Sequence, residues 1–341
     1  MKIVLQKVKQ ASVQVNHQTV GHIGHGFFSQ SVIQTLSYFD IFEYPLTREE
    51  LFHFLWQGQE GLKYGEFLVL LDQEMKENLA GIVERQGGYY FFSGKSEYIA
   101  KRERKVLYTE EKLAIAQRAA QKLRYLPFVK ALFVCNQLPV GVKKGSDIDV
   151  FIVIKRGRMW MTRAFITAVL SFFLLRRSNK SITDLICLSF YVTDDNLDLS
   201  SICISAPDVY QAYWTSQLIP VYDPHNFQVQ IQEKNTWVQK YLRHGFCSYT
   251  LLERWKVQDF WLSRGIKKSL EKLLGGWMGG LFEKHIRFLQ LKKMKINERT
   301  ARPFSNKSVV ISDTMLKFHE NDRKEYFQGE WEKRWKPFAN V

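Results

Sequence analysis

The sequence predicts a mixed fold with α+β and α/β parts, in which a mixed sheet covered by helices follows a small helical module. Three apolar runs, FVKALFVCN, DVFIVI and ICLSFYVT, have the length and composition of buried strands. A long helical pattern from about 159 to 177 separates the last two runs, which gives the order strand, strand, helix, strand of an α/β core. The chain from about Asp208 is predicted to be mostly helical.

Composition limits the class of protein and its partners. The 341 residues, 45% hydrophobic and 14% aromatic, suffice for two or three folded domains. The net charge of +15 favours a polyanionic partner, such as RNA, DNA, nucleotide phosphate or an anionic membrane surface, over a solvated basic surface. No apolar segment reaches the roughly 20 residues of a transmembrane span, and no signal peptide or CxxC pair is present. We therefore expect a cytoplasmic protein without a transmembrane segment.

Residues 1–28 alternate apolar and polar side chains in two strands, and Asn16-His17 suits the turn between them. The segments MKIVLQ, ASV and VGHIGHG resemble the N-terminal β-hairpin of the D-aminoacyl-tRNA deacylases up to about Phe28. The later motifs that form the active site of that family are not found, so we do not infer deacylase activity. We interpret this segment as a fused or relic hairpin rather than a working domain. A mis-joined reading frame, or an appendage that links the protein to tRNA, is a further hypothesis.

Residues 31–105 give the order helix, helix, helix and β-ribbon of a winged-helix-like module. The first helical pattern ends before Pro45, and Thr47 with Glu50 forms a capping box that opens the next helix. A further helix is expected from about Tyr64 to Arg85, ahead of the ribbon GGYYFFSG. Such modules often bind nucleic acid and as often contact protein, and the acidic side chains of this last helix disfavour contact with a DNA groove.

Residues 106–225 form the predicted α/β core, which starts with an amphipathic helix over 109–124 and has Thr109 as its N-cap. Residues 226–341 form a basic helical C-terminal region. Between Leu251 and Thr300 the sequence has twelve Lys or Arg and five Asp or Glu, which suits contact with a polyanion or a membrane surface. A solvated face of helices packed on the core explains the same pattern.

Asp147 and Asp149 open the apolar strand DVFIVI. Residues i and i+2 of a strand project to the same side, so we expect the two carboxylates to lie together, with Ile148 facing the core. Adjacent carboxylates repel, and a divalent cation relieves that repulsion. Mg²⁺ is held in proteins by one or two carboxylates plus substrate phosphates. The pair therefore predicts a metal site, and a cap that binds backbone N–H groups is the alternative.

The segment Ser146-Asp147-Ile148-Asp149, followed by a hydrophobic strand, resembles the DNA polymerase β-type nucleotidyltransferase superfamily. The opening YFDIFEYPLT and the tail LKFHENDRKEY resemble an uncharacterised bacterial group of predicted nucleotidyltransferases, over about residues 31–341. The resemblance implies a nucleotidyltransferase-type mixed sheet, Mg²⁺ as cofactor, and transfer of a nucleoside monophosphate from an NTP to a hydroxyl acceptor. It implies these roles for side chains: Asp147 and Asp149 are catalytic and bind the metal, and Asn136, Gln137 and Ser146 contact the nucleotide.

Two departures from the superfamily pattern bear on activity. The Gly-Ser turn is expected twelve residues before Asp147, where this chain has Cys135-Asn136. Asn136 can still donate a hydrogen bond to phosphate. A third acid is expected on a later strand, but ICLSFYVT has none, and Asp184 and Asp194 only flank it. Either one of these carboxylates turns into the site, or the site has two acids.

These departures leave an alternative to an enzyme. In this alternative the chain keeps a nucleotidyltransferase fold, has lost turnover, and acts as a nucleic-acid-binding or regulatory module. Five cations are expected around the acids, where they either hold triphosphate or form a solvated rim: Lys143, Lys144, Lys155, Arg156 and Arg158.

Overall fold

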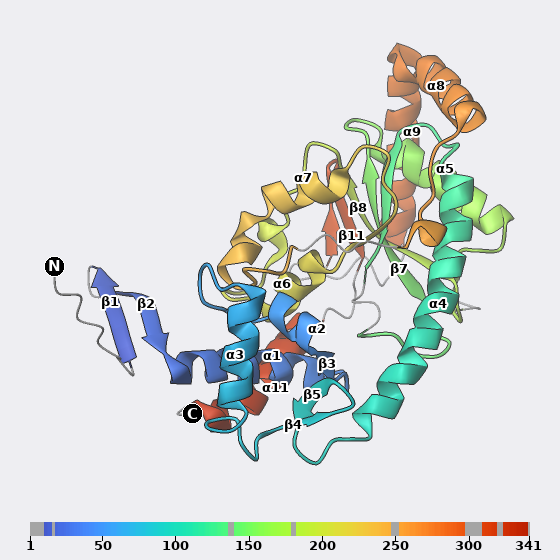
Figure 1. The fold of residues 1–341 in the computed structure, drawn as a ribbon. Coiled ribbons are helices and arrows are strands. Elements are labelled where there is room, and N and C mark those ends of the chain that lie inside the picture. Colours follow the sequence, from blue (N-terminus) through green and yellow to red (C-terminus); the bar gives the residue numbers. More distant parts are fainter. Residues whose placement is uncertain are drawn as a thin grey trace. The chain divides into compact units, whose positions relative to one another are not determined.

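The computed structural model describes residues 10–15, 18–135, 140–178, 182–246, 252–296, 309–318 and 323–339. Figure 1 follows the secondary structure along the chain. The chain divides into two compact units. Unit 1 comprises Met1–Arg102, Gln239–Cys247 and Tyr326–Val341, and unit 2 comprises Glu103–Val238 and Ser248–Glu325.

Unit 1 begins with a β-hairpin in which β1 (Gln10–Val15) pairs antiparallel with β2 (Gln18–Gly24). The two strands predicted on either side of Asn16-His17 are therefore confirmed, and the turn itself lies outside the described residues. Helix α1 (His25–Asp40) follows and ends before Pro45, as predicted.

The capping box predicted in unit 1 is present. Thr47 Oγ1 accepts the Glu50 backbone N–H at 3.2 Å, and a Glu50 carboxylate oxygen accepts the Thr47 N–H at 2.9 Å. These bonds satisfy two free N–H groups at the start of α2 (Arg48–His53). The two-residue strand β3 (Leu46–Thr47) directly precedes this helix.

The next helix of unit 1, α3 (Tyr64–Glu74), is shorter than predicted. The chain turns after Glu74, and Gly81, with a φ of 75°, lies in the turn that leads into a strand. Residues 83–86, which the predicted helix included, instead form β4 (Val83–Gln86), paired with β5 (Tyr89–Phe92). The strand order β3-β5-β4 completes a three-stranded antiparallel sheet.

Unit 2 is built on a six-stranded mixed sheet in the order β10-β11-β8-β7-β6-β9. The three predicted apolar runs form its central strands, with β7 antiparallel to β6 and parallel to β8. Their bounds are β6 (Val129–Val134), β7 (Ile148–Ile154) and β8 (Ile186–Thr193).

The sheet of unit 2 is wider than the sequence predicts. Three short strands at its edges fall after Asp208, where the sequence predicts mostly helix, because three or four residues are too few to show alternation. The C-terminal region therefore adds a hairpin to the sheet as well as helices. These strands are β9 (Ile219–Tyr222), β10 (Val309–Ile311) and β11 (Met315–Phe318).

Helices cover both faces of this sheet. On one face, α4 (Tyr98–Leu123) and α5 (Met159–Phe172) contribute to a core that includes Val150 and Ile152 of β7. On the other face, α6 (Val209–Ser216) and α7 (Phe227–Lys234) pack near Phe151 and Val153. Alternate residues of β7 thus enter opposite cores, as its apolar composition requires.

Two predicted helix boundaries are wrong. Helix α4 starts at Tyr98, and Thr109 lies inside it, where its hydroxyl donates to the Lys105 carbonyl at 2.8 Å instead of capping an end. Helix α5 ends at Phe172, because Leu174 takes the left-handed φ of 55°, which a helix cannot continue through.

Three further α-helices lie toward the C-terminus: α8 (Trp261–Gly275), α9 (Trp277–Ile296) and α11 (Lys324–Trp335). A search of the described helices found none with the length and apolar composition needed to cross a membrane.

Candidate functional site

The turn before β7 is held by hydrogen bonds to one carbonyl group. Ser146 donates its backbone N–H and its hydroxyl to the Lys143 carbonyl oxygen, at 3.2 and 3.0 Å. Gly145 has a φ of 70°, and a Cβ added there would lie 3.4 Å from the Thr183 side chain. Glycine therefore suits this turn, which leads directly to the first acid.

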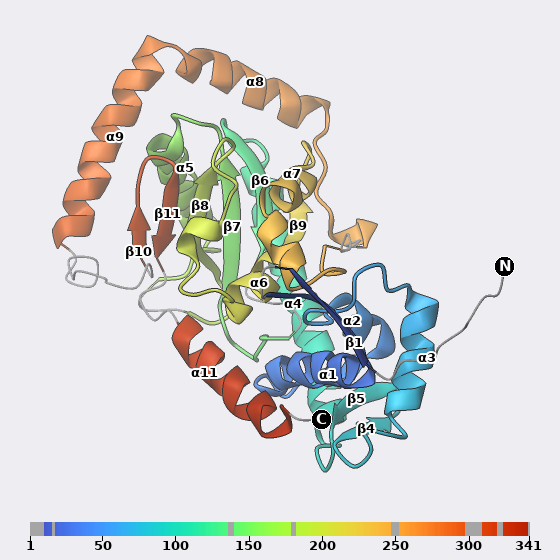
Figure 2. The ribbon, with the colours of Figure 1, turned by 90° about the vertical axis from the view of Figure 1, so that its left-hand side faces the viewer.

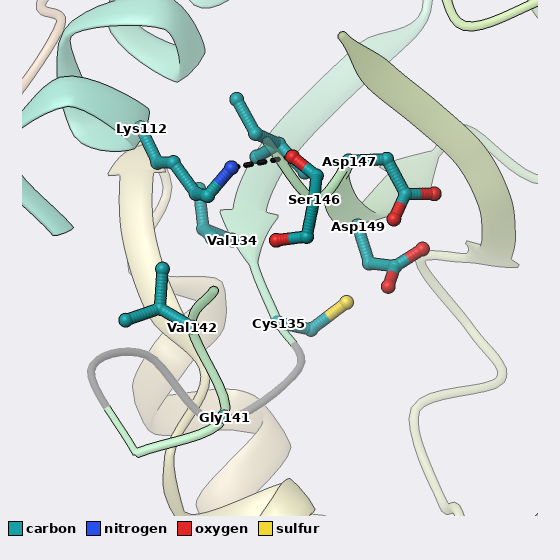
Figure 3. Close-up of a pocket in the computed structure, with 9 residues that line it drawn as sticks. Lys112, Val134, Cys135, Gly141, Val142, Ser146, Asp147 and Asp149 are labelled. Atoms are coloured by element: carbon teal, nitrogen blue, oxygen red, sulfur yellow. Dashed lines mark hydrogen bonds between the residues drawn. The ribbon is translucent and has the colours of Figure 1, made fainter. Parts of the chain in front are cut away.

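Asp147 precedes β7 and Asp149 is its second residue, with Ile148 buried in the core between them. Figure 3 shows the two carboxylates side by side, as the strand alternation predicts. One ligand atom each of Asp147, Asp149 and Cys187 lies within 4.8 Å of the others. The acids thus form a small cluster at the start of β7 and β8.

Arg177 partly neutralises this cluster. It forms an ion pair with Asp147, and its Nη1 lies 3.6 Å from the Cys187 sulfur. The Arg177 backbone N–H also donates to the Ile186 carbonyl at 2.9 Å, which ties the residue to the start of β8. The protein therefore supplies one positive charge against the repulsion between the two carboxylates.

Strand β8 supplies the side chains that face Asp149. Asp149 is paired with Cys187 in the parallel register, and the Ser189 hydroxyl donates to Asp149 Oδ1 at 3.2 Å. A thiol and a hydroxyl thus stand on the strand where the superfamily pattern places a third acid.

Neither acid that flanks β8 turns into the cluster. Asp184 Oδ1 lies 2.9 Å from the Lys112 ammonium. Asp194 accepts the Arg156 backbone N–H at 2.8 Å, beyond the far end of β7 and roughly 16 Å along the strand from Asp149. Among the described residues, the metal-ligating cluster contains neither of them. Of the two alternatives, the structure has the two-acid arrangement.

Burial shifts the pKa values of two groups in the cluster. Burial, reinforced by the charge of Asp147, raises the pKa of the Asp149 carboxyl to about 6. Burial, reinforced by Asp149, also raises the pKa of the Cys187 thiol well above its usual value. Near neutral pH, Asp149 is therefore mostly ionised, whereas Cys187 remains a neutral thiol.

Lys112 of α4 supports the turn from the other side. It is only 2% exposed, and its ammonium donates to the Ser146 carbonyl (Figure 3) as well as pairing with Asp184. Buried lysines are rare unless paired, so this pairing links α4 to both the turn and the loop before β8.

A small pocket opens beside the acids. Its lining includes Cys135, whose backbone N–H donates to the Asp149 carbonyl at 3.0 Å and whose sulfur points toward the carboxylates in Figure 3. Ser146 also lines it, and its hydroxyl is already bonded to Lys143. The predicted nucleotide contacts Asn136 and Gln137 lie outside the described residues.

Three of the five cations predicted to surround the acids lie elsewhere. They follow the opposite end of β7, where Arg156 pairs with Asp195 at 3.2 Å. The reason is strand length, since the seven residues of β7 span roughly 20 Å. The three distant cations are Lys155, Arg156 and Arg158, and the two in the turn beside the acids are Lys143 and Lys144.

The donor set of the cluster fits a hard divalent cation. Two carboxylates suffice for Mg²⁺ when water and substrate phosphates complete its coordination shell. The neutral Cys187 adds no charge for such an ion, and only as a thiolate would it favour a softer metal. Asp147 and Asp149 could therefore hold a metal ion, with the Cys187 sulfur close to the same position.

Sequence reasoning missed four residues of the site. For Lys112 a signal existed, because it shares the apolar face of its predicted helix with Ala116 and Ala119. For the other three no local signal exists, because their position depends on the register of β7 against β8: Arg177, Cys187 and Ser189.

Comparisons of the chain with models of protein families, with curated proteins and with solved structures found no match.

Proposed function

We propose that this chain is a Mg²⁺-dependent nucleotidyltransferase that moves a nucleoside monophosphate from an NTP to a hydroxyl acceptor. The observation that carries the proposal is the pair of carboxylates, Asp147 and Asp149, side by side at the edge of a pocket. When bound there, Mg²⁺ would neutralise charge on the transferring phosphoryl group. In the reaction, the acceptor oxygen forms a bond to the α-phosphorus and gives its proton to water, the bond from the α-phosphorus to the bridging oxygen breaks, and pyrophosphate leaves.

The residues around the pair suit an anionic ligand. Lys143 and Lys144 are exposed in the turn directly before the acids, and Arg177 lies beside Asp147. Ser146 lines the pocket and can turn its hydroxyl from the Lys143 carbonyl to a phosphate oxygen. These side chains would orient the triphosphate, while the two carboxylates hold the metal.

The resemblance to the DNA polymerase β-type nucleotidyltransferases supports the same conclusion. The motif Ser146-Asp147-Ile148-Asp149 stands at the start of a central strand in a mixed sheet, as that resemblance implies. In unit 1, the order α1, β3, α2, α3, β4, β5 and the three-stranded sheet support a winged-helix-like module.

A second candidate function is favoured by a separate observation. The side chains of β8 that face Asp149 are Cys187 and Ser189, so no carboxylate on β8 can accept the proton of the acceptor hydroxyl. On this ground, the alternative is a catalytically degenerate protein that uses its basic surface to bind nucleic acid or to regulate a partner.

Incubation of the protein with each labelled NTP, Mg²⁺ and total cell extract separates the two candidates. The enzyme transfers label to an extract component, and the Asp147→Ala/Asp149→Ala variant does not. Equal labelling by this variant contradicts the proposal. RNA or DNA binding that weakens steeply with salt, without any transfer of label, supports the degenerate protein instead.

A further inference from the structure

Helices α8 and α9 turn their polar side chains toward the sheet and several of their apolar side chains toward solvent. On α8, the buried Lys267 ammonium donates to the Tyr222 hydroxyl at 3.0 Å and to the Val129 carbonyl at 2.5 Å. One turn later, Glu271 accepts the Phe128 backbone N–H at 2.8 Å. The contacts that attach α8 to the core of unit 2 are therefore largely polar.

On α9, polar side chains also contact the core, next to the apolar Ile286, Leu291 and Met294 that pack against it. Glu283 accepts the backbone N–H groups of Trp160 and Met161, at 2.8 and 2.9 Å, and so caps the start of α5. Gln290 donates to the Trp160 carbonyl at 2.7 Å, and Arg287 pairs with Asp313 at 2.7 Å. These bonds orient α9 so that its other face points away from the sheet.

The opposite sides of the two helices carry large apolar side chains in solvent. Leu273 is 70% exposed and Trp277 is 76% exposed, on either side of the bend between the helices shown in Figure 2. A surface helix of a globular protein normally buries such residues. Six of the exposed apolar residues, which we name the α8–α9 apolar face, are Leu262, Ile266, Leu273, Trp277, Leu281 and Phe288.

The α8–α9 apolar face is surrounded by positive charge. Residues 261–296 contain nine Lys or Arg and two Glu, and both Glu side chains are used in the contacts with the core described above. Lys268 and Lys272 on α8, and Lys284 and Lys292 on α9, are exposed. Apolar and cationic side chains therefore share the solvent-facing surface of both helices.

We infer that the α8–α9 apolar face docks on the surface of an anionic lipid bilayer. Helices with Trp, Phe and Leu on one face and Lys or Arg beside them lie in the lipid interface, where apolar burial and attraction to anionic headgroups add. A second copy of the chain is a poorer occupant, because it would bring a second strongly positive surface against the first. This inference does not depend on the proposed nucleotidyltransferase activity.

Flotation of the full chain with lipid vesicles tests the inference. We expect binding to vesicles of phosphatidylcholine mixed with phosphatidylglycerol, and little binding to phosphatidylcholine alone. Leu273→Ser/Leu281→Ser should weaken vesicle partitioning roughly tenfold or more, because the apolar contacts are lost. The matched control is Leu107→Ser, since Leu107 is a helical leucine that is 64% exposed.

Charge reversal tests the electrostatic part. Lys268→Glu/Lys272→Glu should weaken partitioning by roughly tenfold or more. Lys76→Glu/Lys122→Glu should weaken it much less, because these exposed lysines lie elsewhere, in the turn after α3 and on α4. All replaced side chains are exposed, so thermal unfolding should confirm that each variant is folded. Equal binding to neutral vesicles overturns the inference. Absence of vesicle binding also overturns the inference. If sedimentation then shows a dimer that Leu273→Ser/Leu281→Ser disrupts, a second copy of the chain covers the α8–α9 apolar face instead of a lipid bilayer.

Discussion

Asp149 of β7 and Cys187 of β8 are paired across the parallel register of the central sheet. Burial and the neighbouring Asp147 raise the pKa of the Asp149 carboxyl to about 6, and burial keeps the Cys187 thiol protonated. The residue opposite Asp149 on β8 is therefore neutral. Because of this pairing, the site contains two carboxylates, Asp147 and Asp149, and no third acid on β8.

Replacing Cys187 with aspartate should strengthen metal binding. Cys187→Asp places a third carboxylate opposite Asp149, and each added carboxylate increases the attraction for a divalent cation. We expect Mg²⁺ to bind roughly tenfold more tightly in isothermal titration. Cys187→Ser is the matched control and should leave the affinity nearly unchanged. Equal affinity of the Asp and Ser variants contradicts the placement of Cys187 in the metal site.

Removing the guanidinium beside Asp147 should also favour the metal. Arg177 forms an ion pair with Asp147, so it competes with a divalent cation for that carboxylate. Arg177→Gln should bind Mg²⁺ alone several-fold more tightly, while binding of the complete Mg²⁺–NTP complex weakens because a contact to phosphate is lost. Arg176→Gln serves as the control at the exposed neighbouring position. An unchanged Mg²⁺ affinity in Arg177→Gln rejects this competition.

The raised pKa of Asp149 predicts how stability depends on pH. The pKa is about 6 in the folded protein and 3.8 when unperturbed, so between these values the folded state binds more protons than the unfolded state. The metal-free protein should therefore lose stability as the pH rises from about 4 to 6. Asp149→Asn removes this component, and the two denaturant titrations should differ in slope over that range.

The protonation of Asp149 should also determine how much added metal stabilises the folded protein. A divalent cation binds the ionised carboxylate, so Mg²⁺ should raise the melting temperature little below pH 6 and more above it. Asp149→Asn should show a much smaller effect at every pH. An equal Mg²⁺ effect at pH 5 and pH 8 contradicts the assignment of Asp149 as a ligand.

Lys112 should contribute to the stability of the fold and not to the proposed transfer reaction. Lys112→Met removes a buried ammonium that bonds the Ser146 carbonyl and pairs with Asp184. We expect the free energy of unfolding to fall by about 1–3 kcal/mol, because a buried carbonyl loses its donor. Lys122→Met, at an exposed position of the same helix, should change it by less than about 0.5 kcal/mol. Equal effects of the two substitutions would show that the pairing does not hold the turn.

Much of the fold was accessible from the sequence where the signal is local. The apolar runs that became β6, β7 and β8 are long enough to show burial, and the capping box at Thr47 and Glu50 depends only on spacing. The edge strands were not accessible, because β9, β10 and β11 are short and depend on pairing with distant residues. The excess length predicted for α3 and α5 reflects apolar periodicity that continues through turns.

The candidate site was also predictable only where the signal is local. That the Asp147 and Asp149 carboxylates lie close together follows from strand alternation alone. The roles of Cys187, Ser189 and Arg177 depend on the register of β8, which no local pattern encodes. The error over Lys155, Arg156 and Arg158 arose from treating nearness in sequence as nearness in space, although a strand carries its two ends apart.

Calorimetric titration of NTP and Mg²⁺ into the folded protein tests the central claim most directly. We predict binding that requires the metal, that is lost in both Asp147→Ala and Asp149→Ala, and that is retained in Asp195→Ala. The last variant changes an acid near the far end of β7, so it controls for the loss of one negative charge. Unchanged Mg²⁺–NTP affinity in both Asp147→Ala and Asp149→Ala would contradict the account.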